Sequence, residues 1–168
     1  HARLTPPASA GRLPRTLGIT DMRHSRSVYL LLLASFIPFA ACAEDEVSLF
    51  NGSGKADAYI ALDDEMTIYL WSGKPVAYLE KDSESGYHVY GFNGKHLGWF
   101  VKGVIWDHEG NGACAVKEVL QSTQSEPFKA FKQFKPFKSF TQFAPFRPTF
   151  SNKFGDVPCR FLLAEGGK

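Results

Sequence analysis

Residues 90–99, Tyr90-Gly-Phe-Asn-Gly-Lys-His-Leu-Gly-Trp99, place an Asn-Gly turn between two short runs that contain Tyr, Phe and Trp. Aromatic and β-branched residues favour extended strands. The glycine of the turn can adopt the positive φ that a tight hairpin requires. This stretch therefore predicts a β-hairpin.

The same pattern occurs four times between Val47 and Lys117. Each copy is centred on a glycine, with an aromatic residue four positions before it. In the first three copies a lysine follows the glycine, and a second aromatic residue stands five positions after it. The residues that define the repeat are Phe50, Gly54, Lys55 and Tyr59; Tyr69, Gly73, Lys74 and Tyr78; Tyr90, Gly94, Lys95 and Trp99; and Trp106 and Gly110. The fourth copy departs from the pattern in its second half, as terminal repeats often do.

Polar or glycine-containing links, such as Asp63-Asp64-Glu65, join one copy to the next. A single hairpin is unstable in water because its apolar face stays exposed. Four hairpins can pool their aromatic faces around a shared centre. We therefore predict an all-β domain over residues 44–126, with about eight short strands in a pseudo-four-fold arrangement. The length of 168 residues leaves room for this domain and its appendages.

The order Gly-Lys-x-x-[Ala/Gly]-[Tyr/Trp], the aromatic residue before it and the run from Tyr90 to Trp99 resemble the four-fold β-flower family of small bacterial proteins. The resemblance covers residues 47–117. It implies the fold and no catalytic residue, because the family has no characterised activity. WG and MORN repeats are rival families built from short β-repeats.

A leader precedes the repeats. A basic segment follows Met22, residues 28–39 are mainly apolar, and Ala41-x-Ala43 fits cleavage before Glu44. This layout predicts a bacterial secretory signal peptide over residues 22–43. A membrane-anchoring helix is the alternative, but the apolar stretch is shorter than the roughly 20 residues that a span requires. Residues 1–21 are expected to be disordered or not to be part of the native protein.

The three cysteines allow two further expectations. Phe39-Ala-Ala-Cys42 resembles a lipobox, in which Cys42 becomes a lipidated N-terminus. Lipoboxes usually begin with an aliphatic residue, so simple cleavage ranks slightly higher. Either route predicts localisation in the periplasm or the cell envelope. Cys114 and Cys159 could form a disulfide in an oxidising periplasm.

The composition changes after Glu126. Phenylalanine stands at every third position over residues 128–146, and a basic residue follows most of these phenylalanines. Prolines obstruct an α-helix, whereas a polyproline II helix has three residues per turn and would place all of these phenylalanines along one edge. This edge consists of Phe128, Phe131, Phe134, Phe137, Phe140, Phe143 and Phe146. We therefore predict an extended basic tail over residues 127–168.

The formal net charge of +2 conceals an uneven distribution. Residues 44–126 hold 6 basic and 14 acidic residues, whereas residues 127–168 hold 8 basic and 2 acidic residues. Opposite charges favour association of the tail with the domain. We expect the phenylalanine edge to pack along the β-domain or in a groove of a partner, with the lysines at acidic loops. Docking on an anionic membrane surface is the alternative.

The histidines His88, His96 and His108, with Asp107 and Glu109, could form an acid–base or ligand site. The candidates singled out for such a site are His96, Asp57, Asp107 and His108. The spacing of the histidines follows no metal-ligand rule, so no metal is expected. No cofactor is expected either, because Ala56 follows the lysine of Gly52-Ser-Gly-Lys55 where a phosphate-binding loop needs Ser or Thr. The three repeat lysines could form a ring for an anionic ligand or only keep the turns solvated.

The sequence thus predicts an exported structural or binding module of the cell envelope. Its partner would be a protein, a glycan or an anionic surface, and nucleic acid is not expected. A small hydrolase that uses His and Asp groups of the β-domain is the alternative, although no nucleophile elbow is visible. A polar cleft at His96 would favour the hydrolase, and a filled apolar centre would favour the module.

Overall fold

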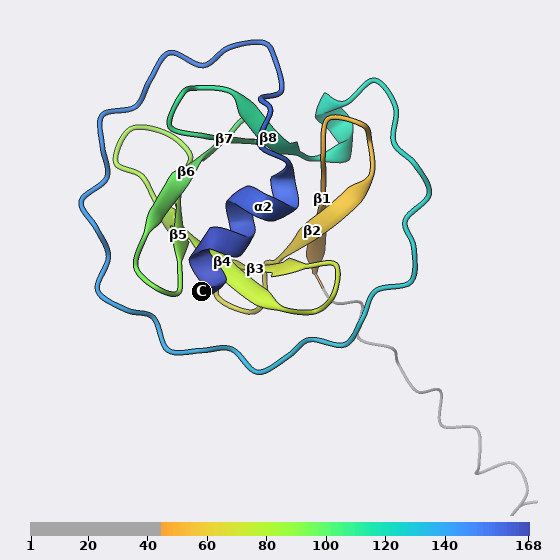
Figure 1. Ribbon diagram of the computed structural model, residues 1–168, viewed down its shortest axis with the longest axis horizontal. Helices are drawn as coiled ribbons and strands as arrows, with labels where there is room; N and C mark the ends of the chain where they lie inside the picture. The colour runs from red at the N-terminus through yellow and green to blue at the C-terminus, as the bar shows by residue number, and fades with distance from the viewer. Residues whose placement is uncertain (1–44) are drawn as a thin grey trace, which may run out of the picture. The chain divides into compact units, whose positions relative to one another are not determined.

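The computed structural model describes residues 45–168, which form a closed barrel of eight antiparallel strands (Figure 1). Each strand pairs with the next one along the chain, and β1 and β8 close the barrel through Phe50 and Ala115. The strands are β1 (Glu46–Phe50), β2 (Ala56–Ala61), β3 (Thr67–Leu70), β4 (Pro75–Lys81), β5 (Tyr87–Gly91), β6 (His96–Val101), β7 (Val104–Trp106) and β8 (Gly112–Ala115). The predicted all-β fold of four consecutive hairpins is confirmed. The predicted leader and the lipidation at Cys42 concern residues outside the described part of the chain.

Each hairpin repeats the same backbone irregularity. The strand register shifts at the residue pairs 49/50, 68/69, 89/90 and 105/106, which are equivalent positions of the four copies. A bulge bends its strand and increases the local twist. Four equivalent bulges therefore curve the meander evenly, which lets β8 meet β1.

The interior of the barrel is aliphatic. The residue before the first aromatic of each copy is fully buried there: Leu49, Ile68, Val89 and Ile105. Successive side chains of a strand point to opposite faces, so the repeat aromatics point outward. The expectation that the aromatic faces meet at a shared centre is therefore wrong. The filled apolar centre is the feature that favours a binding module.

The chain after β8 forms a short 3-10 helix, η2 (Lys117–Val119), and then circles the barrel in an extended conformation over residues 121–158 (Figure 1). We call residues 121–158 the belt. The chain ends in α2 (Cys159–Ala164) and η3 (Glu165–Gly167). The expectation of an extended tail throughout residues 127–168 is thus wrong for its last ten residues, because Leu163 and Cys159 are buried against the barrel core.

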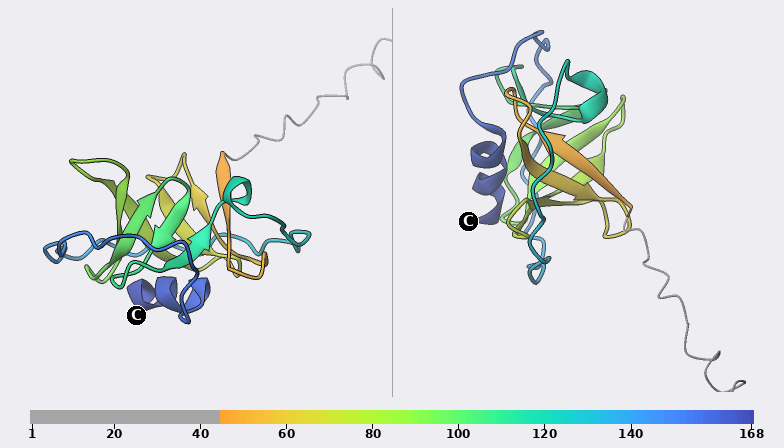
Figure 2. Two further views of the ribbon diagram at one scale, coloured as in Figure 1. Left: turned by 90° about the horizontal axis from the view of Figure 1, so that it is seen from above. Right: turned by 90° about the vertical axis from the view of Figure 1, so that its right-hand side faces the viewer.

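The two ends of the barrel differ. A meander places its hairpin turns at one end and the links between hairpins at the other. We call these the turn end and the link end. The segment α2–η3 lies across the turn end (Figure 2), where the carbonyl oxygen of Gly166 accepts a hydrogen bond of 3.3 Å from the Asn93 N–H. A disulfide between Cys114 and Cys159 ties α2 to β8. Within residues 45–168, no helix is both long and apolar enough to cross a bilayer.

Candidate functional site

The belt is held in a register of nine residues per hairpin. A belt N–H donates a hydrogen bond of 2.8 Å to the carbonyl oxygen of the turn glycine in every copy. The donor and acceptor pairs are Gln124 and Gly54, Gln133 and Gly73, Gln142 and Gly94, and Ser151 and Gly110. The belt is therefore a four-fold element that matches the four-fold barrel.

The turn glycines have a second role besides the turn. Their φ angles lie between 75° and 82°, a backbone conformation that residues other than glycine rarely adopt. These glycines are Gly54, Gly73, Gly94 and Gly110. A Cβ atom at Gly73 would also overlap the carbonyl oxygen of Phe131, and one at Gly94 would overlap that of Phe140. Glycine at these positions therefore lets the belt approach the turns.

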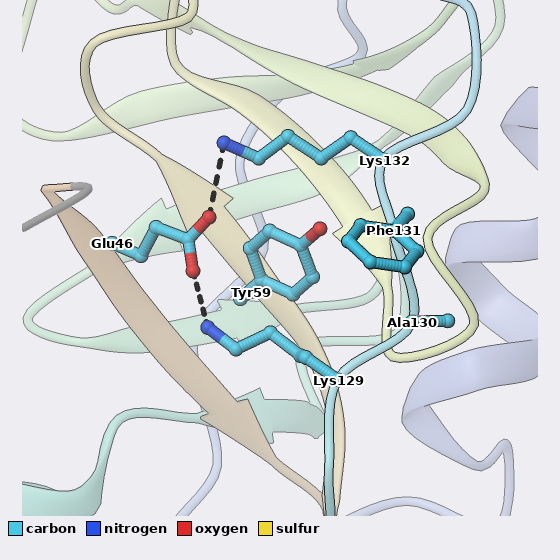
Figure 3. A pocket seen from close by; sticks show the side chains of 6 residues that line it. All are labelled: Glu46, Tyr59, Lys129, Ala130, Phe131 and Lys132. Atoms are coloured by element: carbon cyan, nitrogen blue, oxygen red, sulfur yellow. Dashed lines mark hydrogen bonds and ion pairs between the residues drawn. The ribbon is translucent and has the colours of Figure 1, made fainter. Parts of the chain in front are cut away.

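The first two belt lysines converge on one carboxylate. Glu46 forms ion pairs with Lys129 and Lys132, and the Lys132 Nζ lies 3.0 Å from its Oε1 (Figure 3). The Glu46 side chain is only 9% exposed. The Lys129 ammonium lies 4.5 Å from the centre of the Tyr59 ring, which is a cation–π contact. These side chains line a shallow pocket of about 460 Å³.

The later basic residues of the belt reach the acidic links. Lys135 donates to Asp64 at 2.7 Å, Lys138 donates to Glu65 at 3.1 Å, and Arg147 pairs with Asp82. Burial alone would raise the pKa of Asp64, but hydrogen bonds from Lys135 and Tyr69 hold that pKa below its usual value. The hydrogen bond to Asp64 raises the pKa of Lys135. The positive charges of the belt and the negative charges of the links thus neutralise each other.

The repeat aromatics form the surface on which the belt lies. Tyr59 stacks on Tyr69 with ring centres 5.5 Å apart, and Tyr78 stacks on Tyr90 at 6.2 Å. In the fourth copy Trp106 stacks on Phe150 of the belt at 4.7 Å. Lysine ammonium groups bind favourably to aromatic faces, so the basic edge of the belt lies against the aromatic surface of the barrel.

The phenylalanine edge points away from the barrel. Its seven side chains, from Phe128 to Phe146, are 91–102% exposed. We call these seven residues the phenylalanine rim. The expectation that this edge packs along the β-domain is therefore wrong, because the lysine edge lies there. Phe150 and Phe154, which follow the rim, are partly covered.

Three histidines meet on the outside of the barrel. The His88 Nδ1 lies 3.1 Å from the His96 Nε2, and the His96 Nδ1 lies 2.9 Å from the His108 Nε2. His88 also lies 3.6 Å from Asp82. Burial of His96 and then the charges of its two neighbours lower its pKa to about 4. The array is a hydrogen-bonded chain, and within residues 45–168 no cluster of three His, Cys, Asp or Glu has a metal-binding arrangement.

The two candidate aspartates do not join this cluster. Asp57 lies on β2, four strands away from His96 in a closed barrel of eight, and its carboxylate accepts a hydrogen bond of 3.0 Å from Asn51. The Asp107 carboxylate accepts one of 2.7 Å from the Asn111 N–H in its own turn. The structure therefore brings His96 and His108 together. Asp57 and Asp107 instead accept hydrogen bonds from residues of their own hairpins and lie apart from the histidines' hydrogen-bonded chain.

The structure brings together the three histidines that the sequence groups as one possible site, whereas the register of the belt was not predicted. His88 lies two residues along β5 from Tyr90, which pairs with His96 across the hairpin. Both imidazoles therefore lie on one face, and the predicted hairpin already held this signal. For the belt, the signal was the nine-residue spacing of Gln124, Gln133 and Gln142.

The comparison with known families extends beyond the hairpins. The sequence model of a family described as 4-fold beta flower protein matches residues 47–163. The match begins in β1 and ends within α2, so it includes the belt. No curated protein and no solved structure shows significant similarity to the chain. Because the match spans more than half of the sequence, the protein belongs to the four-fold β-flower family.

Proposed function

We propose that the protein is a binding module of the bacterial cell envelope that presents the phenylalanine rim to an apolar partner. The observation that carries this proposal is the 91–102% exposure of all seven rim side chains. Single exposed apolar residues are normal, but a continuous series of them marks an interaction surface. The rim is such a series.

The anchoring of the belt supports this proposal. Backbone hydrogen bonds at every hairpin and the ion pairs of Lys129, Lys135 and Arg147 fix the chain that carries the rim. A surface that is already ordered loses less conformational entropy when it binds. The described geometry is therefore that of a preorganised binding edge.

Export is supported by the sequence of residues 22–43 and by the Cys114–Cys159 disulfide, since such bonds persist in oxidising compartments. Mass spectrometry of the exported protein tests this part. We expect an N-terminus at Glu44 or a lipidated Cys42. An exported protein whose N-terminus lies upstream of Met22 would contradict it.

Binding is preferred over hydrolysis because the candidate groups are dispersed. Asp57 and His96 lie on opposite sides of the barrel, and the His96 side chain is buried, with only 5% exposed. A catalytic base must reach the proton that it removes. The barrel centre offers no alternative site, because aliphatic side chains fill it.

The triple substitution Phe131→Ser, Phe134→Ser and Phe137→Ser tests the rim. We expect an unchanged unfolding midpoint, because these side chains are exposed, together with loss of bis-ANS fluorescence enhancement and of saturable binding to an isolated envelope fraction. Phe150→Ser is the contrasting variant, and it should lower the midpoint because Phe150 stacks on Trp106. Binding of the triple variant at wild-type strength would overturn the proposal.

A further inference from the structure

We infer that the turn end of the barrel is a docking face for an anionic lipid bilayer. In this arrangement the bordering phenylalanines of the rim enter the headgroup region and the exposed cations of the turn end meet the lipid phosphates. The inference rests on the proposed function, since it names the partner of the rim.

Exposed cations gather at the turn end. Lys55, Lys74 and Lys95 directly follow the turn glycines, and Arg160 and Lys168 belong to the C-terminal segment that crosses this end. Among residues 45–168, no acidic partner forms an ion pair with Lys55, Lys74 or Arg160, whereas Lys95 and Lys168 share Glu165. The turn end therefore offers positive charge to an external anion, although three further exposed acidic residues lie near it: Glu109, Glu126 and Asp156.

The belt cations from Lys129 to Arg147 cannot serve the same purpose. Lys129 and Lys132 are engaged by Glu46, Lys135 by Asp64, and Arg147 by Asp82. An anionic surface would have to compete with these internal carboxylates. Attraction to anionic lipid is thus assigned to the turn-end cations rather than to the Phe-Lys sequence itself.

Two shallow hollows join the turn-end cations to the rim. The first is about 520 Å³ and is lined by Lys55, Trp71, Phe128 and Arg160, among others. The second is about 310 Å³ and is lined by Phe137 and Lys168, among others. In each hollow a rim phenylalanine borders a cation of the C-terminal segment. Cationic and aromatic groups on one face are the combination that binds anionic membrane interfaces.

The shape of the rim favours a fluid partner. An extended chain advances about 3.1 Å per residue, so neighbouring rim phenylalanines are roughly 9 Å apart along the belt. The belt curves around the barrel (Figure 1), and the seven rim side chains along it are exposed. A rigid protein groove would have to match this spacing and this curvature. A lipid interface adapts to both, so we commit to a bilayer as the partner.

Vesicle co-sedimentation with the purified protein tests the inference. One vesicle contains equal parts of phosphatidylglycerol and phosphatidylcholine, and the other contains phosphatidylcholine alone. We expect about a hundredfold tighter binding or more to the anionic vesicle, weakened by added salt. Trp71 borders the first hollow, so its fluorescence should shift to the blue when the protein binds.

Matched variants separate the contributions. The turn-end variant combines Lys55→Gln, Lys74→Gln and Arg160→Gln. It should bind anionic vesicles about a hundredfold more weakly, since each cation near the surface raises the affinity roughly fivefold. Phe128→Ser with Phe137→Ser should weaken binding to both vesicles. The control is Lys81→Gln, Lys102→Gln and Lys117→Gln, which removes the same charge outside the turn end, from exposed positions near the link end. It should bind within about twofold of the wild type.

Three results would overturn the inference. Wild-type binding by the turn-end variant would show that its cations play no part. Equal losses in the turn-end and control variants would show that only net charge matters. Failure of the wild type to bind either vesicle, with rim-dependent binding to bis-ANS and to the envelope fraction intact, would exclude a bilayer and leave the proposed function standing. A rigid protein or a second copy would then be the partner.

Discussion

The backbone N–H of Gln133 donates a hydrogen bond of 2.8 Å to the carbonyl oxygen of Gly73, sixty residues earlier in the chain. The same bond recurs at the other three hairpins, one every nine belt residues. The belt is therefore registered on the barrel by its backbone, while its side chains divide between an inner basic edge and an outer phenylalanine edge. This division makes the rim available to a partner.

Substitution of Gly73 should loosen the belt. Gly73→Ala should lower the free energy of unfolding by about 2 kcal/mol or more, because alanine is strained at a φ of 79° and its Cβ overlaps the Phe131 carbonyl oxygen. Gly73→Asn separates the two causes, since asparagine tolerates positive φ but still carries a Cβ. Urea unfolding measures both variants. Full recovery in Gly73→Asn would contradict the role of Gly73 in belt approach.

The ion pair of Lys129 should contribute more than an exposed pair. Lys129→Gln is expected to cost about 1–2 kcal/mol, because it removes a charge-assisted hydrogen bond to the 9%-exposed Glu46 and a cation–π contact with Tyr59. Lys168→Gln is the control, since Lys168 and Glu165 are both exposed and such pairs contribute little. Equal effects in urea unfolding would show that the belt lysines do not anchor the belt.

The Cys114–Cys159 disulfide should stabilise the folded chain by joining the two ends of the segment that contains the belt. Cys114 and Cys159 are separated by 45 residues, and this interval contains the whole belt. In the chain-entropy description a bond across such a loop stabilises the fold by about 4 kcal/mol. Cys114→Ala with Cys159→Ala should lower the unfolding free energy by an amount of this order. Urea unfolding of the oxidised wild type and of this double variant measures the loss, and equal unfolding free energies would contradict the prediction.

Stability should fall as the pH is lowered from about 7 to about 4. The pKa of His96 drops to about 4 in the folded protein from an ordinary value of 6.5, so the unfolded chain binds more protons between these two values. The expected loss is about 3 kcal/mol across this window. The lowered pKa values of Asp64 and Asp82 act in a more acidic range.

His96→Gln provides the comparison for this pH dependence. The variant removes the titrating imidazole and should flatten the slope of unfolding free energy against pH between about 4.5 and 6.5. The slope is the readout, because the substitution also removes the bonds to His88 and His108 and lowers stability at every pH. An unchanged slope would show that another group is responsible.

The barrel could be predicted because each hairpin carries its own local signals. Gly73 and Gly94 mark turns, and the residues around them alternate as strands do. The same alternation predicts that Ile68 and Tyr69 face opposite sides, but not which of them is inside. The belt decides this, because it covers Tyr69 with Lys132 and so leaves the interior to Ile68.

The arrangement of the tail could not be derived from the sequence in the same way. A period of three predicts that Phe131 and Lys132 belong to different edges, but the edge that faces the barrel depends on Glu46 and Tyr59, more than seventy residues away. The helix α2 has only six residues, too few to be stable alone. The disulfide and the burial of Leu163 stabilise it, and neither is a local property.

Hydrogen exchange of the belt amides, followed by NMR, tests the central claim most directly. The amides of Gln124, Gln133, Gln142 and Ser151 should exchange slowly, because each is bonded to a turn glycine. Their neighbours Phe134 and Phe143, whose amides donate no backbone hydrogen bond within residues 45–168, should exchange at nearly the rate of an unstructured chain. Protection that recurs every nine residues is the predicted result. Exchange of all these amides at the unstructured rate would show that the belt is not docked and would contradict the claim.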